Sequence, residues 1–268
     1  MLANLLFTVP FAVFTAIFVL IGYLTGFNNL IVWMLGIIPA FPLYAGFVMV
    51  VRKYSVEKTD CDVIKVFFDS AKGNLKKSFA NGVIVYAIGA CSVLSLLYYW
   101  TASKTDIIYS SMFTILMLFT LLIFVMMFYV PLMTVTYELR LRDIYKNSFW
   151  MILDQILKNI GTLLLVGIFT LGAVVALVFT EGVWFVISAV LTVLLYPLIY
   201  TYIVVSMISK GLQDSVGSFT ATPEIEEPAE DEIGPENQAF QNAESNNDYI
   251  FVNGRMIKNP AKKDKTEE

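Results

Sequence analysis

The chain has 268 residues, of which 57% are hydrophobic and 15% are charged, and its mean hydropathy is +0.71. This composition lies outside the usual range of water-soluble globular proteins and is typical of integral membrane proteins. The chain has no His, which excludes nucleophile pairs that use His and zinc sites that use His ligands. The two cysteines, Cys61 and Cys91, are too few for a disulfide framework or a thiolate metal site.

The net charge of −4 is unevenly distributed along the chain. Residues 1–208 carry 12 basic and 9 acidic side chains, a net charge of +3, whereas residues 209–268 carry 6 basic and 13 acidic side chains, a net charge of −7. The sequence therefore predicts an apolar body followed by an acidic tail, and no nucleic-acid partner is expected.

Charge-free stretches predict six membrane-spanning helices. A helix needs about 20 apolar residues to cross a hydrocarbon core of about 30 Å. The first stretch, residues 1–51, is long enough for two crossings, and Thr25–Asn29 interrupts it with turn-forming residues. The first span lacks a basic leading segment, so it is interpreted as a retained anchor and not as a cleavable signal. The predicted spans are Leu5–Tyr23, Leu30–Val51, Phe79–Trp100, Ile107–Val135, Gly161–Phe179 and Val183–Ile208.

Basic residues predict the orientation of these spans. The connections 52–78 and 138–158 hold eleven Lys and Arg side chains, whereas the opposite turns hold only Lys104. By the positive-inside rule, both connections, the N-terminus and the C-terminal tail are expected in the cytoplasm of a multi-pass plasma-membrane protein. In this orientation three tryptophans lie at the outer ends of spans, namely Trp33, Trp100 and Trp184. Such a position is expected for an aromatic belt at the membrane interface.

Each long connection contains a predicted amphipathic helix, over Asp62–Lys72 and over Asp143–Lys158. Such a helix either lies in the lipid headgroup layer or presents its aromatic face to a protein partner, and both alternatives remain open. The aromatic residues chosen as candidates for partner docking are Phe67, Phe68, Phe149 and Trp150.

The segment after Lys210 differs in composition from the spans. Residues 222–247 are rich in Glu, Pro, Asn and Gln, a composition that predicts disorder. The segment 249–257 has alternating apolar residues around an Asn-Gly pair, which predicts a small hairpin, a short motif that orders on a partner, or part of a solvated tail.

None of the predicted spans contains a charged side chain. Proton relays and ion pathways use intramembrane ionisable groups, so a proton-coupled carrier is not expected. Coupling of a cation through carbonyls and hydroxyls, or uncoupled passage of a neutral solute, is not excluded. Neutral polar residues in the spans predict hydrogen bonds between helices, with Gly82 and Gly89 on a face of close helix contact.

The sequence contains no Walker A loop, dinucleotide fingerprint, paired Cys-x-x-Cys or Gly-x-Ser-x-Gly elbow. The carboxylates outside the spans sit among basic residues, where salt bridges are their ordinary role. We therefore expect no enzyme activity, no catalytic residue, no metal and no cofactor.

Two sets of segments resemble the YesL-like family of bacterial integral membrane proteins, whose domain is called domain of unknown function 624. The resemblance extends over about residues 1–210 and implies a multi-span protein encoded near carbohydrate uptake systems, without an established activity. The segments that carry it are Asn4–Leu6, Pro10, Pro42–Tyr44, Val51–Lys53, Val66–Phe68 and Lys72–Lys76, and in the second half Tyr129–Leu132, Leu139–Asp143 and Lys146–Ser148.

The sequence thus predicts an all-α polytopic membrane protein, with a six-span domain at residues 1–210 and an acidic, mostly disordered cytoplasmic tail at residues 211–268. In function, we expect an accessory or regulatory partner of a carbohydrate uptake system, such as a sugar-uptake permease. The alternative is an uncoupled or cation-coupled transporter of a neutral solute such as a sugar, which six spans with several prolines would suit.

Overall fold

A computed structural model describes residues 1–104, 106–220, 249–252 and 255–258. The body is helical, and six of its helices are long and apolar enough to cross a membrane. Two neighbouring helices, α2 and α3, continue into a π-helical turn, η1, and form one of these spans. The helices are α1 Leu2–Thr25, α2 Leu30–Met34, α3 Ile37–Arg52, η1 Lys53–Glu57, α4 Val63–Gly73, α5 Leu75–Ala102, α6 Ile107–Thr136, α7 Leu141–Asp154, α8 Ile156–Val178 and α9 Gly182–Thr220.

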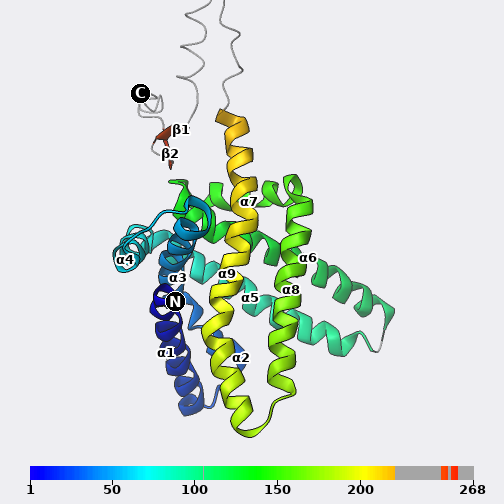
Figure 1. The fold of residues 1–268 in the computed structure, drawn as a ribbon. Helices are drawn as coiled ribbons and strands as arrows, with labels where there is room; N and C mark the ends of the chain where they lie inside the picture. The colour runs from blue at the N-terminus through cyan, green and yellow to red at the C-terminus, as the bar shows by residue number, and fades with distance from the viewer. Residues whose placement is uncertain (105, 221–248, 253–254, 259–268) are drawn as a thin grey trace, which may run out of the picture.

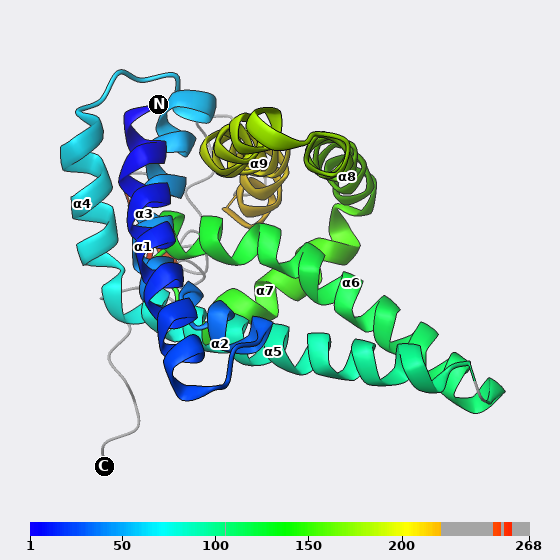
Figure 2. The same ribbon diagram turned by 90° about the horizontal axis from the view of Figure 1, so that it is seen from below.

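The spans form three antiparallel hairpins, in which α1 pairs with α2 and α3, α5 with α6, and α8 with α9 (Figure 1). The three hairpin tips point away from the end of the bundle where η1, α4 and α7 lie, which we call the capped end. The α5–α6 hairpin leans away from the α8–α9 hairpin in both views (Figures 1 and 2). The spans are therefore close together near the capped end and diverge toward their tips.

The hydrophobic core lies in the capped half of the bundle, where α3, α6 and α9 meet. All three tips are instead exposed, as expected for helix surfaces that face lipid. The largest fully buried side chains of the core include Phe47, Phe128, Tyr129, Leu132 and Ile208.

Glycines allow the close helix contacts in this core. A Cβ atom at Gly46 of α3 would lie 2.5 Å from the carbonyl oxygen of Phe67 in α4. A Cβ atom at Gly82 of α5 would lie 2.9 Å from the carbonyl oxygen of Ile38 in α3, and one at Gly89 would lie 3.0 Å from the methyl group of Met34. The predicted face of close contact at Gly82 and Gly89 is thus confirmed.

The three tryptophans predicted at the outer ends of spans lie near the three tips. Trp33 is in α2, Trp100 is near the end of α5 and Trp184 is near the start of α9. Each has at least a third of its surface exposed, and the ammonium of Lys104 lies 5.7 Å from the centre of the Trp100 ring.

The structure confirms all six predicted spans and the helix predicted over Asp62–Lys72, which is α4. It corrects the helix predicted over Asp143–Lys158, because the backbone leaves the helical conformation at Gln155. The residues before this point form α7, and those after it belong to the span α8. In the second span, Leu35–Gly36 separates α2 from α3, where a Cβ atom at Gly36 would lie 3.0 Å from the backbone nitrogen of Thr15.

Near the C-terminus, α9 continues to Thr220, beyond the predicted domain boundary at residue 210. The disorder predicted for residues 222–247 lies outside the described residues. Strand β1, Tyr249–Val252, pairs antiparallel with strand β2, Arg255–Lys258, and Tyr249 lies opposite Lys258. Of the three alternatives for this segment, the pairing supports the hairpin.

Candidate docking surface on helix α7

Helix α7 is held against the bundle by one apolar face. It begins after Arg140, whose backbone is extended, and Asp143 in the first turn complements the positive end of the helix dipole. Ile144, Ser148 and Met151 recur at intervals of four and three residues, so they share one face of the helix, and all three are buried. The hydroxyl of Ser148 also donates to the sulfur of Met133 in α6, at 3.5 Å.

The opposite face of α7 is aromatic and exposed. Phe149 has 42% and Trp150 has 59% of its surface exposed, and their ring centres lie 6.1 Å apart at 73°. Leu153, one turn further along, is also exposed. Exposed Phe, Trp and Leu side chains on a fixed helix are typical of a surface that binds lipid or a protein partner.

Asn159 fixes the turn between α7 and α8. Its side-chain nitrogen donates to the carbonyl oxygen of Ile152 at 3.1 Å, so it pairs a backbone acceptor that the end of α7 leaves free. Its side-chain oxygen accepts a hydrogen bond of 2.7 Å from the hydroxyl of Tyr129 in α6. Asn159 therefore joins α6, α7 and α8, and it is buried.

Helix α9 packs against the same turn. A Cβ atom at Gly211 would lie 3.0 Å from the side-chain nitrogen of Lys158 and still closer to the side-chain amide of Gln155. The exposed face of α7 thus sits on a junction that contacts both α6 and α9.

Helix α4 carries the other predicted aromatic pair. Its start is capped by Asp62, whose carboxylate accepts hydrogen bonds from the backbone nitrogens of Ile64 and Lys65 at 3.1 and 3.2 Å. Phe67 is fully buried, because the close approach at Gly46 turns this face of α4 against α3. Phe68 is 39% exposed. Of the two, only Phe68 remains accessible, so the choice of Phe67 as a docking residue is corrected.

The structure does not bring the two aromatic pairs together. Figure 2 places α4 at one side of the molecule, beyond α1 and α3, and α7 between α5 and α8. Phe68 and the pair Phe149 and Trp150 therefore belong to separate surfaces, and Trp150 on α7 is the most exposed of these aromatic side chains.

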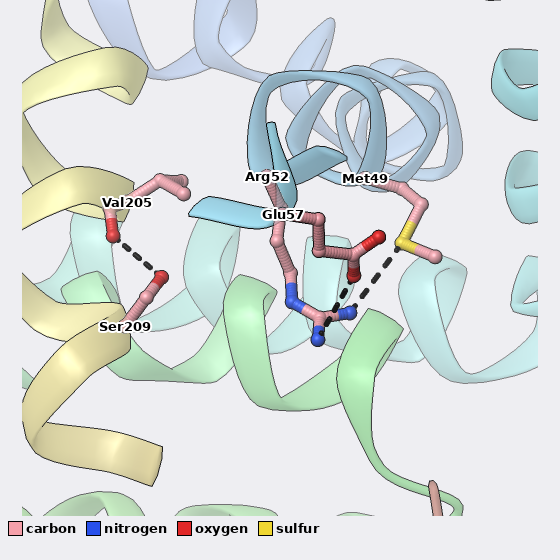
Figure 3. Close-up of polar contacts among 5 residues, drawn as sticks. All are labelled: Met49, Arg52, Glu57, Val205 and Ser209. Carbon is pink, nitrogen blue, oxygen red and sulfur yellow. Dashed lines mark hydrogen bonds and ion pairs between the residues drawn. The ribbon is translucent and has the colours of Figure 1, made fainter. Parts of the chain in front are cut away.

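A half-buried ion pair closes the second span at the capped end. The guanidinium of Arg52 lies 3.2 Å from the carboxylate of Glu57 and 4.0 Å from the sulfur of Met49 (Figure 3). The wide turn of η1 places Glu57 beside Arg52, five residues earlier, and Lys58 ends it in the left-handed region, with φ of 50°. Helix α9 contacts η1, and Figure 3 shows on α9 the hydrogen bond of the Ser209 hydroxyl to the carbonyl oxygen of Val205.

Two tyrosines at the capped end are shielded from water. Burial raises the pKa of the Tyr145 phenol in α7 to about 12. Burial also raises the pKa of Tyr137, and the positive charge of Arg52 partly offsets this rise. The Tyr145 hydroxyl has no hydrogen-bond partner among the described residues. These groups stay neutral near pH 7 and act in packing.

Within the described part of the chain, no three His, Cys, Asp or Glu side chains lie close enough together to hold a metal ion. The accessible surface of α7 is formed by the aromatic side chains of Phe149 and Trp150 on a helix that is fixed by its buried face.

Sequence reasoning did not identify two features of the capped end, the hydrogen bonds of Asn159 and the ion pair of Arg52 with Glu57. Asn159 appears in the sequence as one more polar residue before a span, and its position directly after an amphipathic segment was the available signal. The pairing of Arg52 with Glu57 depends on the π-helical turn, for which the sequence carries no recognisable pattern.

A family model described as "Protein of unknown function, DUF624" matches residues 1–96, which run from α1 into α5. The similar segments between Tyr129 and Ser148 lie beyond the matched stretch. No curated protein and no solved structure matches the chain.

Proposed function

This membrane protein carries a DUF624 family domain over residues 1–96, and from that premise we propose that it acts by association, as an accessory or regulatory partner of a carbohydrate uptake system. The family description names no activity. The observation that carries the proposal is the exposed aromatic face of α7, at Phe149 and Trp150.

The way in which α7 is held against the bundle supports a docking role for its exposed aromatic face. The opposite face of α7 is buried in the bundle, and Asn159 fixes the end of the helix. A surface held in place in this way loses little conformational freedom on binding, so more of its contact energy appears as affinity. Trp is also among the residues that most often dominate binding energies at protein interfaces.

The distribution of charge supports placing this surface in the cytoplasm. The connections that hold α4 and α7 carry eleven basic side chains, and the opposite turns carry one. We propose that the capped end and both termini face the cytoplasm of a plasma membrane, and that the three tryptophans near the tips lie at the outer interface.

We also propose that the chain is not an enzyme. It has no His and none of the common nucleotide-binding or nucleophile motifs. Its well-packed polar groups, such as Asn159 and Tyr129, are engaged in bonds between helices.

Co-purification tests the association. A tagged chain is extracted in mild detergent from its natural membrane, and captured permease and ATPase subunits of sugar-uptake systems are quantified by mass spectrometry. We expect the double variant Phe149→Ala/Trp150→Ala to lose this capture. The matched control is Trp184→Ala/Phe185→Ala, a similarly exposed aromatic pair at the opposite end of the molecule, which should retain it.

The result that contradicts docking through α7 is equal capture by both double variants. Phe68→Ala is tested separately, because it reports on the surface of α4. If only Phe68→Ala abolishes capture, the docking surface is that of α4.

A variant that keeps Trp150 as its only tryptophan distinguishes protein docking on α7 from contact of α7 with lipid alone. In liposomes without a partner, quenching of Trp150 fluorescence by a headgroup-level quencher measures contact with lipid. When the partner is added, docking on α7 should reduce this quenching, whereas a helix that serves only as a membrane anchor should show no change.

The transport alternative is tested with purified protein in liposomes. Uptake of labelled sugars faster than in empty liposomes would favour a transporter of a neutral solute over an accessory protein.

A further inference from the structure

A cavity of about 380 Å³ lies between α6 and α8, away from the capped end. One wall is Phe124 of α6, and the other is a face of α8. The α8 side chains and backbone that line it are Leu163, Val166, Gly167, Thr170, Leu171 and Val174. This volume falls within the range of about 300–1,000 Å³ that is usual for small-ligand sites.

The cavity exists because α6 and α8 diverge and because α8 has no side chain at Gly167. A Cβ atom at Gly167 would meet nothing within 4 Å. In both views α6 leans away from α8 toward its tip, while α8 stays beside α9 (Figures 1 and 2).

The cavity walls offer no free polar group. The hydroxyl of Thr170 donates to the carbonyl oxygen of Val166 at 2.7 Å, and the hydroxyl of Tyr196 lies 2.9 Å from Thr170 and donates to it. None of the lining residues is among the described residues with an unpaired buried polar atom. A sugar here would lose its hydrogen bonds to water without replacing them, so the cavity favours a hydrocarbon.

The position of the cavity indicates that the hydrocarbon comes from the lipid bilayer. Gly167 is the twelfth residue of α8, about 16 Å along the helix axis, close to the middle of a hydrocarbon core of about 30 Å. Leu171 is 65% exposed and Val174 is 47% exposed, so the cavity opens sideways onto the same surface that meets the bilayer. A chain entering from the bilayer would not cross any polar region.

We infer that this cavity binds an acyl chain of a membrane phospholipid between α6 and α8. The bound chain fills the space left where the two helices diverge, and it packs against Phe124 and the bare backbone at Gly167. The site is independent of the docking surface proposed for α7.

Photolabelling tests the site in the full-length protein. The protein is placed in vesicles of phosphatidylethanolamine and phosphatidylglycerol that contain a trace of phosphatidylcholine with a diazirine on its acyl chain. After photolysis, labelled peptides are mapped by mass spectrometry. We expect labelling at residues 163–174 and near Phe124 to exceed, severalfold, that on the exposed outer half of α6.

Gly167→Leu fills the cavity and should reduce this labelling severalfold. Gly172→Leu is the matched control, because it lies on the same helix, also has open space around it and does not line the cavity. Both changes replace a helical Gly by a better helix former, so both variants should keep the unfolding temperature of the wild type or exceed it.

Three outcomes would overturn the inference. The first is labelling of α8 that is unchanged in Gly167→Leu, which indicates lipid moving freely over the surface. The second is crosslinking of two chains through this face, which indicates that a second copy fills the cavity. The third is loss of labelling on addition of a free sugar, which indicates a solute site.

Discussion

The hydroxyl of Tyr129 donates a hydrogen bond of 2.7 Å to the side-chain oxygen of Asn159, and both residues are buried. The two lie 30 positions apart in the chain, on α6 and α8. This bond and the contact of the Asn159 nitrogen with the carbonyl oxygen of Ile152 connect two spans to the surface helix between them.

We expect Tyr129→Phe to lower the free energy of unfolding by about 1 kcal/mol, as hydrogen bonds between membrane helices typically contribute. Asn159→Leu should cost more, about 2–3 kcal/mol, because it leaves the Tyr129 hydroxyl and the Ile152 carbonyl oxygen without partners. Unfolding in lipid–detergent bicelles measures both. Asn147→Ala, at an exposed position on α7, is the control, and a loss as large as that of Asn159→Leu would contradict this account.

The contact of α3 with α4 should tolerate no side chain at Gly46. In Gly46→Ala, the added Cβ atom would lie 2.5 Å from the carbonyl oxygen of Phe67, and a backbone atom held in a packed helix has little room to move. We expect a loss of several kcal/mol, or failure to accumulate folded protein. Gly73→Ala, at the end of α4, meets nothing within 4 Å and should be neutral, so similar losses in both variants would refute the close packing.

The buried phenol of Tyr145 should make the protein less stable in alkali. Its pKa in the folded state, about 12, is above the value of about 10 in the unfolded chain, so the folded state holds the proton more tightly between these values. Stability should therefore be unaffected by this group below pH 10 and should fall from pH 10 to 12. Tyr137 acts in the same direction.

Unfolding measured as a function of pH checks this effect. Tyr145→Phe should flatten the decline without abolishing it, and it should cost little at pH 7, because the hydroxyl it removes has no partner among the described residues. A decline of unchanged slope in Tyr145→Phe would show that the phenol is not shielded.

Lys58 ends η1 with a backbone that is unfavourable for a residue with a side chain, since its φ is 50°. Lys58→Gly should raise stability by up to about 1 kcal/mol by relieving this strain, and Lys58→Val should lower it. The side chain is exposed, so packing contributes little to either change. Thermal unfolding measures the stability of both variants. A lower stability of Lys58→Gly than of the wild type would contradict the strained left-handed backbone at Lys58.

The spans could be predicted because their signal is simple. Charge is costly in a bilayer, so stretches without charge mark the crossings, and all six helices begin within five residues of their predicted starts. The side on which the basic residues gather also predicted that α4 and α7 share one end of the bundle.

Details that depend on packing could not be predicted. Phe67 and Phe68 are adjacent and equally apolar, and the degree to which each is buried depends on how closely α3 approaches α4 at Gly46. The end of α7 at Gln155 depends on Asn159, whose partners lie on another span or are backbone atoms. The cavity beside Gly167 results from the divergence of two hairpins, which no local pattern encodes.

The length of α9 has a consequence for the acidic tail. Its 39 residues extend about 58 Å, more than the 40–45 Å of a bilayer with its headgroups. The excess rises above α7 at the capped end (Figure 1). A bilayer around the spans would leave the last turns of α9 outside the headgroup layer, so the chain leaves the described helix, after Thr220, at a point where repulsion from anionic lipid is weakened by salt over about 8–10 Å.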